Sequence, residues 1–136
     1  MTAPLRPAWR TAFVAAAICV CLAELLATHL PGDRLPHVGA SDKTLHAIAY
    51  FALAGTFWAT LASWGLPRRK RLGLLLAVAP LYAALDEITQ PWFGRYSEPR
   101  DWLADMAGTA AAAIVLELVL LAGTRSRPGS RENRPT

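Results

Sequence analysis

Four apolar blocks, each long enough to cross a bilayer as a helix, account for most of this 136-residue chain. The blocks cover residues 11–30, 44–66, 72–88 and 102–122. A helix needs about 20 mainly apolar residues to span the hydrocarbon core of a membrane, and roughly 17–25 are tolerated. Charged residues make up only 18% of the chain, against about 25% in an average soluble domain. The sequence therefore predicts an all-α, polytopic membrane protein, a bundle of four transmembrane helices.

The same pattern sets the expected domain organisation. Residues 1–124 leave room for one four-helix membrane domain and for no separate soluble domain. Residues 125–136 are rich in Arg, Pro, Gly and Ser, so we expect a disordered basic tail that contacts lipid headgroups. The first block follows Arg6 and Arg10, as in a signal peptide, but its apolar run exceeds the usual ~7–15 residues. We expect this block to be a retained helix rather than a cleaved signal peptide.

Basic residues are concentrated in alternate connections of the predicted bundle. They precede the first block, separate the second from the third, and follow the fourth: Arg6, Arg10, Arg68, Arg69, Lys70, Arg71, Arg125, Arg127, Arg131 and Arg134. Because cytoplasmic loops carry the excess of Lys and Arg, we expect both chain ends to be cytoplasmic. Residues 31–43 and 90–101 would then face outward. Since the net charge of +4 comes from clusters beside membrane spans, the expected partner is the lipid bilayer, and no nucleic acid.

Polar side chains at the outward ends of three blocks repeat at helical spacing. Residues three or four apart share one face of a helix. The resulting stripes are Asp42, His46 and Tyr50; Tyr82, Asp86 and Gln90, with Glu87 beside them; and Asp101, Asp105, Gly108 and Ala112. An ionised side chain at the centre of a bilayer costs about 2.5–3.5 kcal/mol even on the mildest scale. We therefore expect the stripes to face one another in a polar pocket, with Gly108 and Ala112 allowing two helices to approach closely.

The residue types in these stripes indicate two sets of roles. Candidates for acid/base catalysis are Asp42, His46, Asp86, Glu87 and Asp101. Candidates for substrate binding are Lys43, Tyr50, Gln90, Arg95 and Asp105. An imidazole with a pKa near 6.5 suits proton transfer at neutral pH, but His46 could equally join helix ends by bonding Asp42 or a loop carboxylate.

Alternative roles also stay open for the other charged candidates. Asp86 and Glu87 lie at a helix C-terminus, which disfavours acids, so salt bridges to Lys43 or Arg95 compete with a catalytic role. Arg95 could hold the phosphate or carboxylate of a lipid headgroup, or neutralise Asp86 or Asp101. All of these interpretations predict that His46, Gln90 and Arg95 lie within a few ångströms of one another.

Other polar residues give weaker signals. His29 and His37 are expected in exposed loops, and the histidines lack the close spacing of a metal motif, so we predict no metal site and leave any cofactor unknown. Glu24 could reach the polar pocket from the first block. Glu117 could extend toward the inner interface.

Several of these motifs together resemble the VanZ-like family of small bacterial integral membrane proteins. The matching pieces, between residues 41 and 108, are Asp42-Lys43-x-x-His46-x-x-x-Tyr50, Asp86-Glu87-x-x-Gln90, Arg95 and Asp101-x-x-x-Asp105-x-x-Gly108. The chain differs at Asp105, where many relatives carry Asn. The resemblance implies a multi-pass protein of the bacterial inner membrane and cell envelope. The family is named after a protein associated with resistance to teicoplanin, a glycopeptide antibiotic that targets a lipid-linked cell-wall precursor.

The expected function is binding or modification of a lipid-linked or cell-wall-related substrate at the outward polar pocket, with a lipid-linked precursor as a possible partner. The family resemblance extends to a link with glycopeptide resistance but does not assign resistance to this chain. A non-catalytic binding or shielding protein is the alternative, and proton or ion transport ranks last. The sequence leaves open whether the protein is an enzyme.

Overall fold

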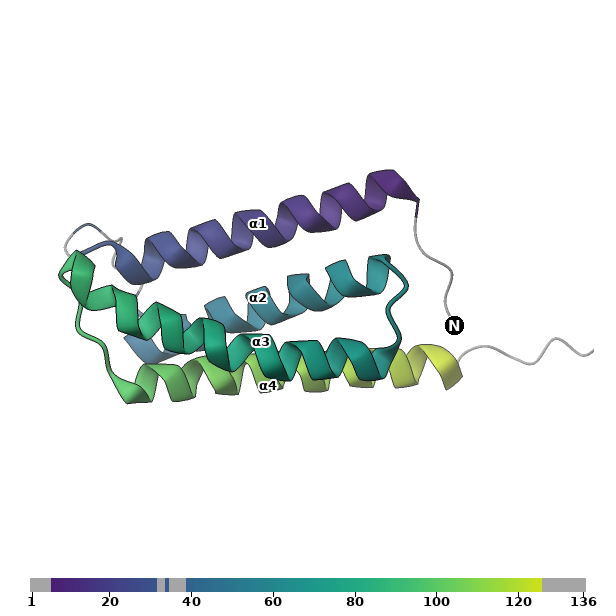
Figure 1. The fold of residues 1–136 in the computed structure, drawn as a ribbon. Coiled ribbons are helices and arrows are strands. Elements are labelled where there is room, and N and C mark those ends of the chain that lie inside the picture. Colours follow the sequence, from purple (N-terminus) through teal and green to yellow (C-terminus); the bar gives the residue numbers. More distant parts are fainter. Residues whose placement is uncertain (1–5, 32–33, 35–38, 126–136) are drawn as a thin grey trace, which may run out of the picture.

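The structure, a computed structural model, describes residues 6–31, 34 and 39–125. They form four long helices and one short 3₁₀ helix, namely α1 (Pro7–His29), α2 (Asp42–Ser63), α3 (Arg68–Thr89), η2 (Gln90–Phe93) and α4 (Pro99–Arg125) (Figure 1). The four long helices are each long and apolar enough to cross a membrane. The predicted all-α, four-helix bundle is confirmed, and the chain is a multi-pass membrane protein.

Each long helix begins two to four residues before the apolar block that predicted it. The difference arises because hydropathy locates the part inside the membrane, whereas capping residues locate the helix start. Ser41 Oγ accepts a hydrogen bond from the Thr44 N–H at 3.2 Å and so caps α2. The helix α3 ends at Thr89, just before Pro91, as expected. Gly94, at φ +78°, then turns the chain toward α4.

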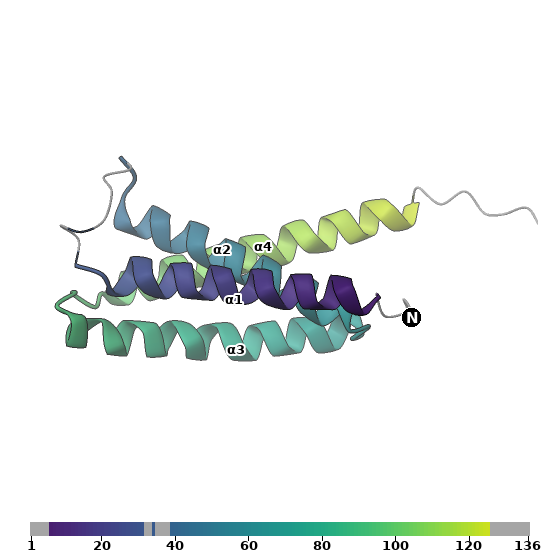
Figure 2. The ribbon, with the colours of Figure 1, turned by 90° about the horizontal axis from the view of Figure 1, so that it is seen from above.

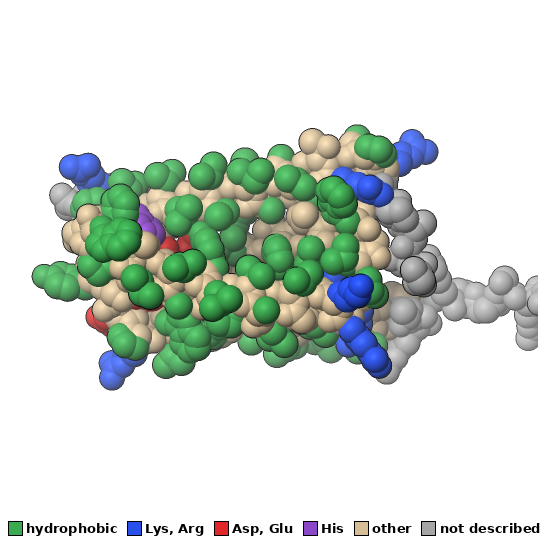
Figure 3. Space-filling view, viewed as in Figure 1, with side chains coloured by type: hydrophobic (Ala, Val, Ile, Leu, Met, Phe, Trp, Pro, Cys, Tyr) green, Lys and Arg blue, Asp and Glu red, His purple; other side chains and the backbone are tan. Residues whose placement is uncertain are grey.

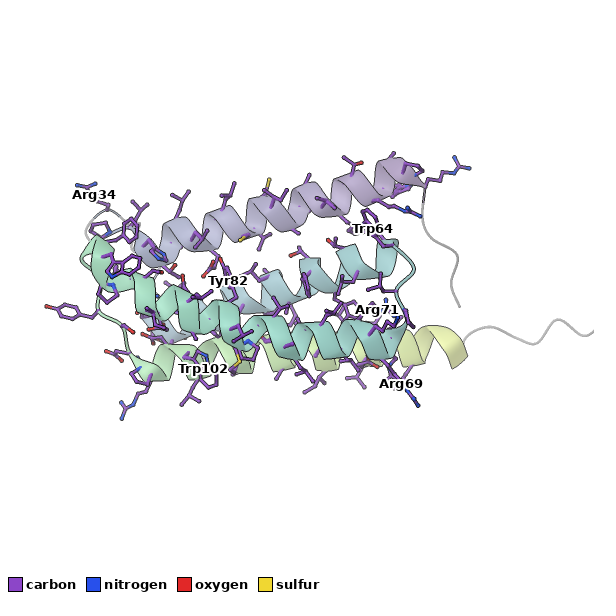
Figure 4. The ribbon with its side chains drawn as sticks, viewed as in Figure 1. Arg34, Trp64, Arg69, Arg71, Tyr82 and Trp102 are labelled. Atoms are coloured by element: carbon purple, nitrogen blue, oxygen red, sulfur yellow. The ribbon has the colours of Figure 1, made fainter. Side chains whose placement is uncertain are left out.

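The helices alternate in direction, and Figure 2 shows the same arrangement from above. The start of α1, the α2–α3 connection and the end of α4 lie together at one end, which we call the basic end because it carries Arg69 and Arg71 (Figure 4). The opposite end holds the end of α1, the start of α2 and η2, and we call it the polar end. Both described ends of the chain therefore lie on the same side of the bundle, as expected for four spans.

Small residues allow α2 and α4 to approach most closely. These two helices share the most extensive contact in the bundle. Gly108 lies so near the α2 backbone that a Cβ atom there would overlap the carbonyl oxygen of Ala47. Ala112, one turn further on, is 1% exposed. The close approach predicted for these two residues is confirmed.

The two halves of the bundle differ inside. The half nearer the basic end holds the hydrophobic core, with Ala54, Trp58, Leu75 and Ala112. Large apolar side chains also cover the outside of the helices, as Figure 3 shows, which suits contact with lipid tails. The half nearer the polar end is filled instead with polar side chains.

At the basic end, aromatic and acidic side chains accompany the arginines. The guanidinium of Arg71 lies 4.6 Å from the ring centroid of Trp58. Arg68 forms an ion pair with Glu117, so Glu117 does reach toward this end of the bundle. Two predictions, the loop position of His37 and the tail beyond Arg125, concern residues outside the described ranges.

Candidate functional site

Eight buried polar side chains gather in the half of the bundle nearer the polar end, and we call them the polar cluster. They are Glu24, Thr28, His46, Asp86, Glu87, Gln90, Asp101 and Asp105, and none is more than 6% exposed. All four long helices and η2 contribute to the cluster. In Figure 3, acidic and histidine side chains are visible beneath apolar ones near this end. The stripes predicted from helical spacing therefore face the inside of the bundle rather than lipid.

His46 of α2 and Asp105 of α4 form the most deeply buried pair of the cluster. His46 Nδ1 is hydrogen-bonded to Asp105 Oδ1 at 2.9 Å, and the two side chains are 3% and 0% exposed. Asp105 Oδ2 has no hydrogen-bond partner among the described residues. The close approach of α2 and α4 at Gly108, one turn after Asp105, explains why these two helices supply the pair.

The partner expected for His46, Asp42, is engaged elsewhere. Asp42 Oδ1 lies 3.2 Å from Arg95 Nη2, and the Asp42 side chain is 49% exposed. Asp42 sits at the start of α2, one turn outside His46, and forms its ion pair with Arg95 of the α3–α4 connection. His46 was expected to bond either Asp42 or a loop carboxylate. The carboxylate that bonds its Nδ1 instead comes from Asp105, within α4.

Asp86 has hydrogen-bond donors on both carboxylate oxygens. Thr28 Oγ1 donates to Oδ1 at 2.9 Å, and Gln90 Nε2 donates to Oδ2 at 3.1 Å. His29 Nδ1 lies 3.5 Å from Oδ1. Asp86 thereby joins α1 to α3 through neutral hydroxyl and amide donors, together with an imidazole.

Glu87 is held by the α3–α4 connection. Its Oε2 accepts hydrogen bonds from Ser97 Oγ at 2.8 Å and from the Glu98 N–H at 3.0 Å. Its Oε1 is buried without a partner in the described part of the chain. The turn at Gly94 returns the connection over the end of α3, which places Ser97 and Glu98 beside this carboxylate.

The salt bridges expected from Asp86 and Glu87 to Lys43 or Arg95 are not the ones observed. Lys43 Nζ instead lies 3.0 Å from Glu98 Oε2 and 3.2 Å from Asp101 Oδ1. Arg95 pairs with Asp42, as described above. Both cations therefore sit at the rim of the polar cluster, because they belong to the first turn of α2 and to the connection rather than to the bundle interior. The prediction that Asp86 and Glu87 form salt bridges with Lys43 or Arg95 was therefore wrong.

His29 was expected in an exposed loop, and this prediction is also wrong. It is the last residue of α1, and its side chain is only 13% exposed. His29 Nε2 is hydrogen-bonded to Thr89 Oγ1 at 2.9 Å, and the ring meets the edge of Phe93 with centroids 4.9 Å apart. The signal in the sequence was the pair Glu24 and Thr28, which are four residues apart and share a face of the helix, followed directly by His29.

Glu24 does reach the polar pocket, one of the outcomes left open. Its Oε2 accepts a hydrogen bond from Tyr82 OH at 2.7 Å, whereas Oε1 is buried without a described partner. Glu24, Thr28, Ser97 and Glu98 belong to the observed site but were absent from the predicted site residues. Ser97 and Glu98 could not be found by periodicity because they lie in a loop.

The predicted site residues thus divide into an interior and a rim. His46, Asp86, Glu87, Gln90, Asp101 and Asp105 are brought together inside, with Tyr50 also buried, while Asp42, Lys43 and Arg95 form the rim. The hydrogen bonds and ion pairs of His46, Gln90 and Arg95 go to Asp105, Asp86 and Asp42 respectively. The mutual proximity of those three residues stays a prediction.

An apolar cavity of about 310 Å³ lies next to the polar cluster. It is lined by side chains of α1, α2 and α3 that include Ile18, Leu53 and Val78. Figure 3 shows the surface hollowed between α1 and α3, and these helices make few contacts with each other. Tyr50 and Tyr82 line the cavity, and Tyr82 also bonds Glu24, so the cavity and the cluster share a wall. Tyr82 is labelled in Figure 4.

No family model, curated protein or solved structure matches this chain. The chemistry of the site therefore has to be argued from its own residues. A buried imidazole–carboxylate pair can exchange protons. Carboxylate oxygens without donors can accept hydrogen bonds from hydroxyl, amide or ammonium groups, or bind a cation. The adjoining cavity offers an apolar surface to a hydrocarbon chain.

Proposed function

We propose that this chain is a VanZ-like protein of the bacterial cell envelope that binds a lipid-linked ligand. The polar headgroup lies at the polar cluster, and the hydrocarbon tail lies in the apolar cavity. The observation that carries this proposal is the shared wall: Tyr82 lines the cavity and donates a hydrogen bond to Glu24 of the cluster. A ligand with an apolar and a polar part fits such a pair of adjoining environments.

The charges at the site favour a particular kind of headgroup. Lys43 and Arg95 already face carboxylates, whereas oxygens of Glu24, Glu87 and Asp105 lack donors among the described residues. Sugar hydroxyls and peptide amides supply the missing donors, and both occur in cell-wall precursors. Arg95 at the rim, whose Nε also lacks a described partner, supports contact with a phosphate near the membrane surface.

The proposed orientation follows from the basic residues. The basic end, with Arg68, Arg69, Lys70 and Arg71, is cytoplasmic in the inner membrane, and the polar cluster opens toward the outer face. Proton or ion transport is not favoured, because Ala54, Trp58, Leu75 and Ala112 fill the half of the bundle that a polar route would have to cross.

A binding measurement with matched variants tests the proposal. The full chain, purified in lipid nanodiscs, is titrated with a polyprenyl-linked cell-wall precursor and, in parallel, with phosphatidylglycerol. Val78→Trp fills the cavity, and we expect it to weaken precursor binding by about tenfold or more, because a well-packed cavity leaves no room for the tail. Leu81→Trp on the lipid-facing side of the same helix, where Leu81 is 68% exposed, is the control. Equal binding by both variants, or no preference for the precursor, would overturn the proposal.

The His46–Asp105 pair favours acid/base chemistry as an addition to binding. A catalytic site predicts that His46→Gln retains precursor binding but loses product, which mass spectrometry of the extracted lipid detects. A purely binding site predicts that the wild-type protein leaves the precursor unchanged over the same period.

A further inference from the structure

The geometry points to a binding site for a divalent transition-metal ion of the Zn²⁺ or Mn²⁺ class, with His46, Glu87 and Asp105 as ligands. One ligand atom from each of these side chains lies within 4.8 Å of the other two, and all three side chains are buried. They come from α2, α3 and α4, so no two share a helix. Spacing within the sequence, on which the prediction of no metal site rested, could not have revealed such a set.

Unpartnered oxygens provide independent support. Glu87 is 6% exposed and Asp105 is 0% exposed, yet Glu87 Oε1 and Asp105 Oδ2 have no hydrogen-bond partner in the described chain. A buried polar atom without a partner is costly, by about 1–3 kcal/mol for a neutral group and more for a charged one. A cation between the two carboxylates satisfies both oxygens at once.

The distance between His46 and Asp105 is compatible with shared coordination. Their facing atoms, Nδ1 and Oδ1, are 2.9 Å apart. Two neighbouring ligands held about 2.1 Å from one octahedral ion are about 3 Å apart. The pair can therefore share either a proton or a metal ion, and metal binding would release that proton.

The balance of charge also favours a cation. Two carboxylates, one neutral imidazole and a divalent ion sum to zero, which suits a buried site within a membrane. The side chains that surround the three ligands add Glu24, Asp86 and Asp101, which are all acidic and buried. The nearest described cations, Lys43 and Arg95, have their own ion pairs at the rim with Asp101, Glu98 and Asp42.

The ligand types narrow the choice of metal. Imidazole suits Zn²⁺ and other transition ions, and carboxylates suit Mn²⁺ as well as Mg²⁺ and Ca²⁺. A site with one imidazole and two carboxylates should thus prefer Zn²⁺ or Mn²⁺ to Mg²⁺. A second group, Asp42, His46 and Asp101, has ligand atoms within the same 4.8 Å of one another and shares His46. Because Asp42 is exposed, this group offers a route from the rim to the interior.

Metal binding can be measured without any lipid ligand. The full-length protein, purified in detergent and treated with a chelator, is dialysed against ZnCl₂, MnCl₂ or MgCl₂, and bound metal is counted by mass spectrometry. We expect one Zn²⁺ or Mn²⁺ ion per chain. Loss of a residue that only orients a metal ligand commonly costs 10–100-fold in metal affinity, so loss of a ligand through Glu87→Gln or Asp105→Asn should weaken binding by about tenfold or more. Glu117→Gln, which alters the carboxylate paired with Arg68 at the basic end and outside both groups, should bind like the wild type.

A spectroscopic measurement on the wild-type protein covers the case in which a variant does not fold. Electron paramagnetic resonance of the Mn²⁺-loaded protein should show coupling to an imidazole nitrogen, and a folded His46→Gln protein should lose it. The proposal is overturned if the wild-type protein takes up no metal at millimolar concentration, or if the folded variants bind metal as tightly as the wild type does. Binding of Mg²⁺ at least as tightly as Zn²⁺, or the absence of nitrogen coupling in the Mn²⁺-loaded protein, would also overturn it. None of these results would bear on the cavity variants Val78→Trp and Leu81→Trp.

Discussion

At the scale of single residues, the number of hydrogen-bond donors separates structural from reactive carboxylates. Both oxygens of Asp86 have donors, from Thr28 and Gln90, so this residue, predicted as catalytic, is better suited to joining α1 and α3. Glu87 and Asp105 each keep one oxygen without a described partner. Such oxygens remain available to a substrate or an ion, which makes these two acids the stronger candidates for chemistry.

The His46–Asp105 pair should contribute measurably to stability. In chelator-treated protein, His46→Ala and Asp105→Ala should each lower the free energy of unfolding by at least about 1–3 kcal/mol, because each leaves a buried partner without its hydrogen bond. The double variant should lose less than the sum of the two single losses. Denaturation in mixed micelles, followed by circular dichroism, measures all three. Glu98→Gln, at the exposed Lys43 ion pair, should cost about 0–1 kcal/mol, and strictly additive losses for the first pair would contradict this account.

The two tyrosines of the shared wall, Tyr50 and Tyr82, should respond differently to loss of the hydroxyl group. Tyr82→Phe removes the donor to Glu24 Oε2 and should destabilise the protein by about 1–3 kcal/mol. Tyr50→Phe removes a buried hydroxyl that has no described partner, so its unfolding free energy should stay the same or rise. Thermal unfolding of the two purified variants gives the comparison. The reverse order of stabilities would show that Tyr50 has a partner outside the described contacts.

At the scale of the helices, one glycine determines how α2 and α4 fit together. Gly108 brings the backbone of α4 against Ala47, and this contact lies one turn after Asp105 on α4 and next to His46 on α2. The geometry of the His46–Asp105 pair therefore depends on a small residue that has no polar group of its own. α1 differs, because its contact with α3 is limited and is made largely through Thr28, His29 and Glu24.

Enlarging Gly108 should separate α2 from α4. A Cβ atom at Gly108 would overlap Ala47 backbone, which cannot yield as a side chain can, so Gly108→Ala should cost about 1–3 kcal/mol. Gly55→Ala is the matched control, since a Cβ there meets no atom within 4 Å. It should be neutral or should stabilise α2 by up to about 1 kcal/mol, the helix preference of Ala over Gly. Unfolding midpoints of both variants decide the matter, and equal midpoints would refute the close contact.

At the scale of the whole molecule, local patterns were sufficient for the fold and insufficient for the contacts. Hydropathy located four helices, and helical spacing identified which side chains of α2, α3 and α4 face inward. Which of those side chains meet depends on how far each helix is rotated and shifted against its neighbour. That is why the hydrogen bond of His46 Nδ1 goes to Asp105 rather than to Asp42. The position of Ser97 against Glu87 likewise depends on the path of a loop, which has no periodicity to interpret.

The alternating helices require the two ends of the bundle to lie on opposite sides of the membrane, and cysteine labelling can establish which side is which. After Cys19 and Cys21 are replaced, single cysteines are introduced at Tyr96, which is 91% exposed at the polar end, and at Arg69, which is exposed at the basic end. Because Lys and Arg are retained on the cytoplasmic side, a membrane-impermeant maleimide should label Tyr96→Cys on intact cells and Arg69→Cys only after permeabilisation. Tyr96 is a better probe than Ser97, whose hydroxyl holds Glu87. Labelling of position 69 from outside, with position 96 protected, would reverse the orientation and place the polar cluster near the cytoplasmic leaflet.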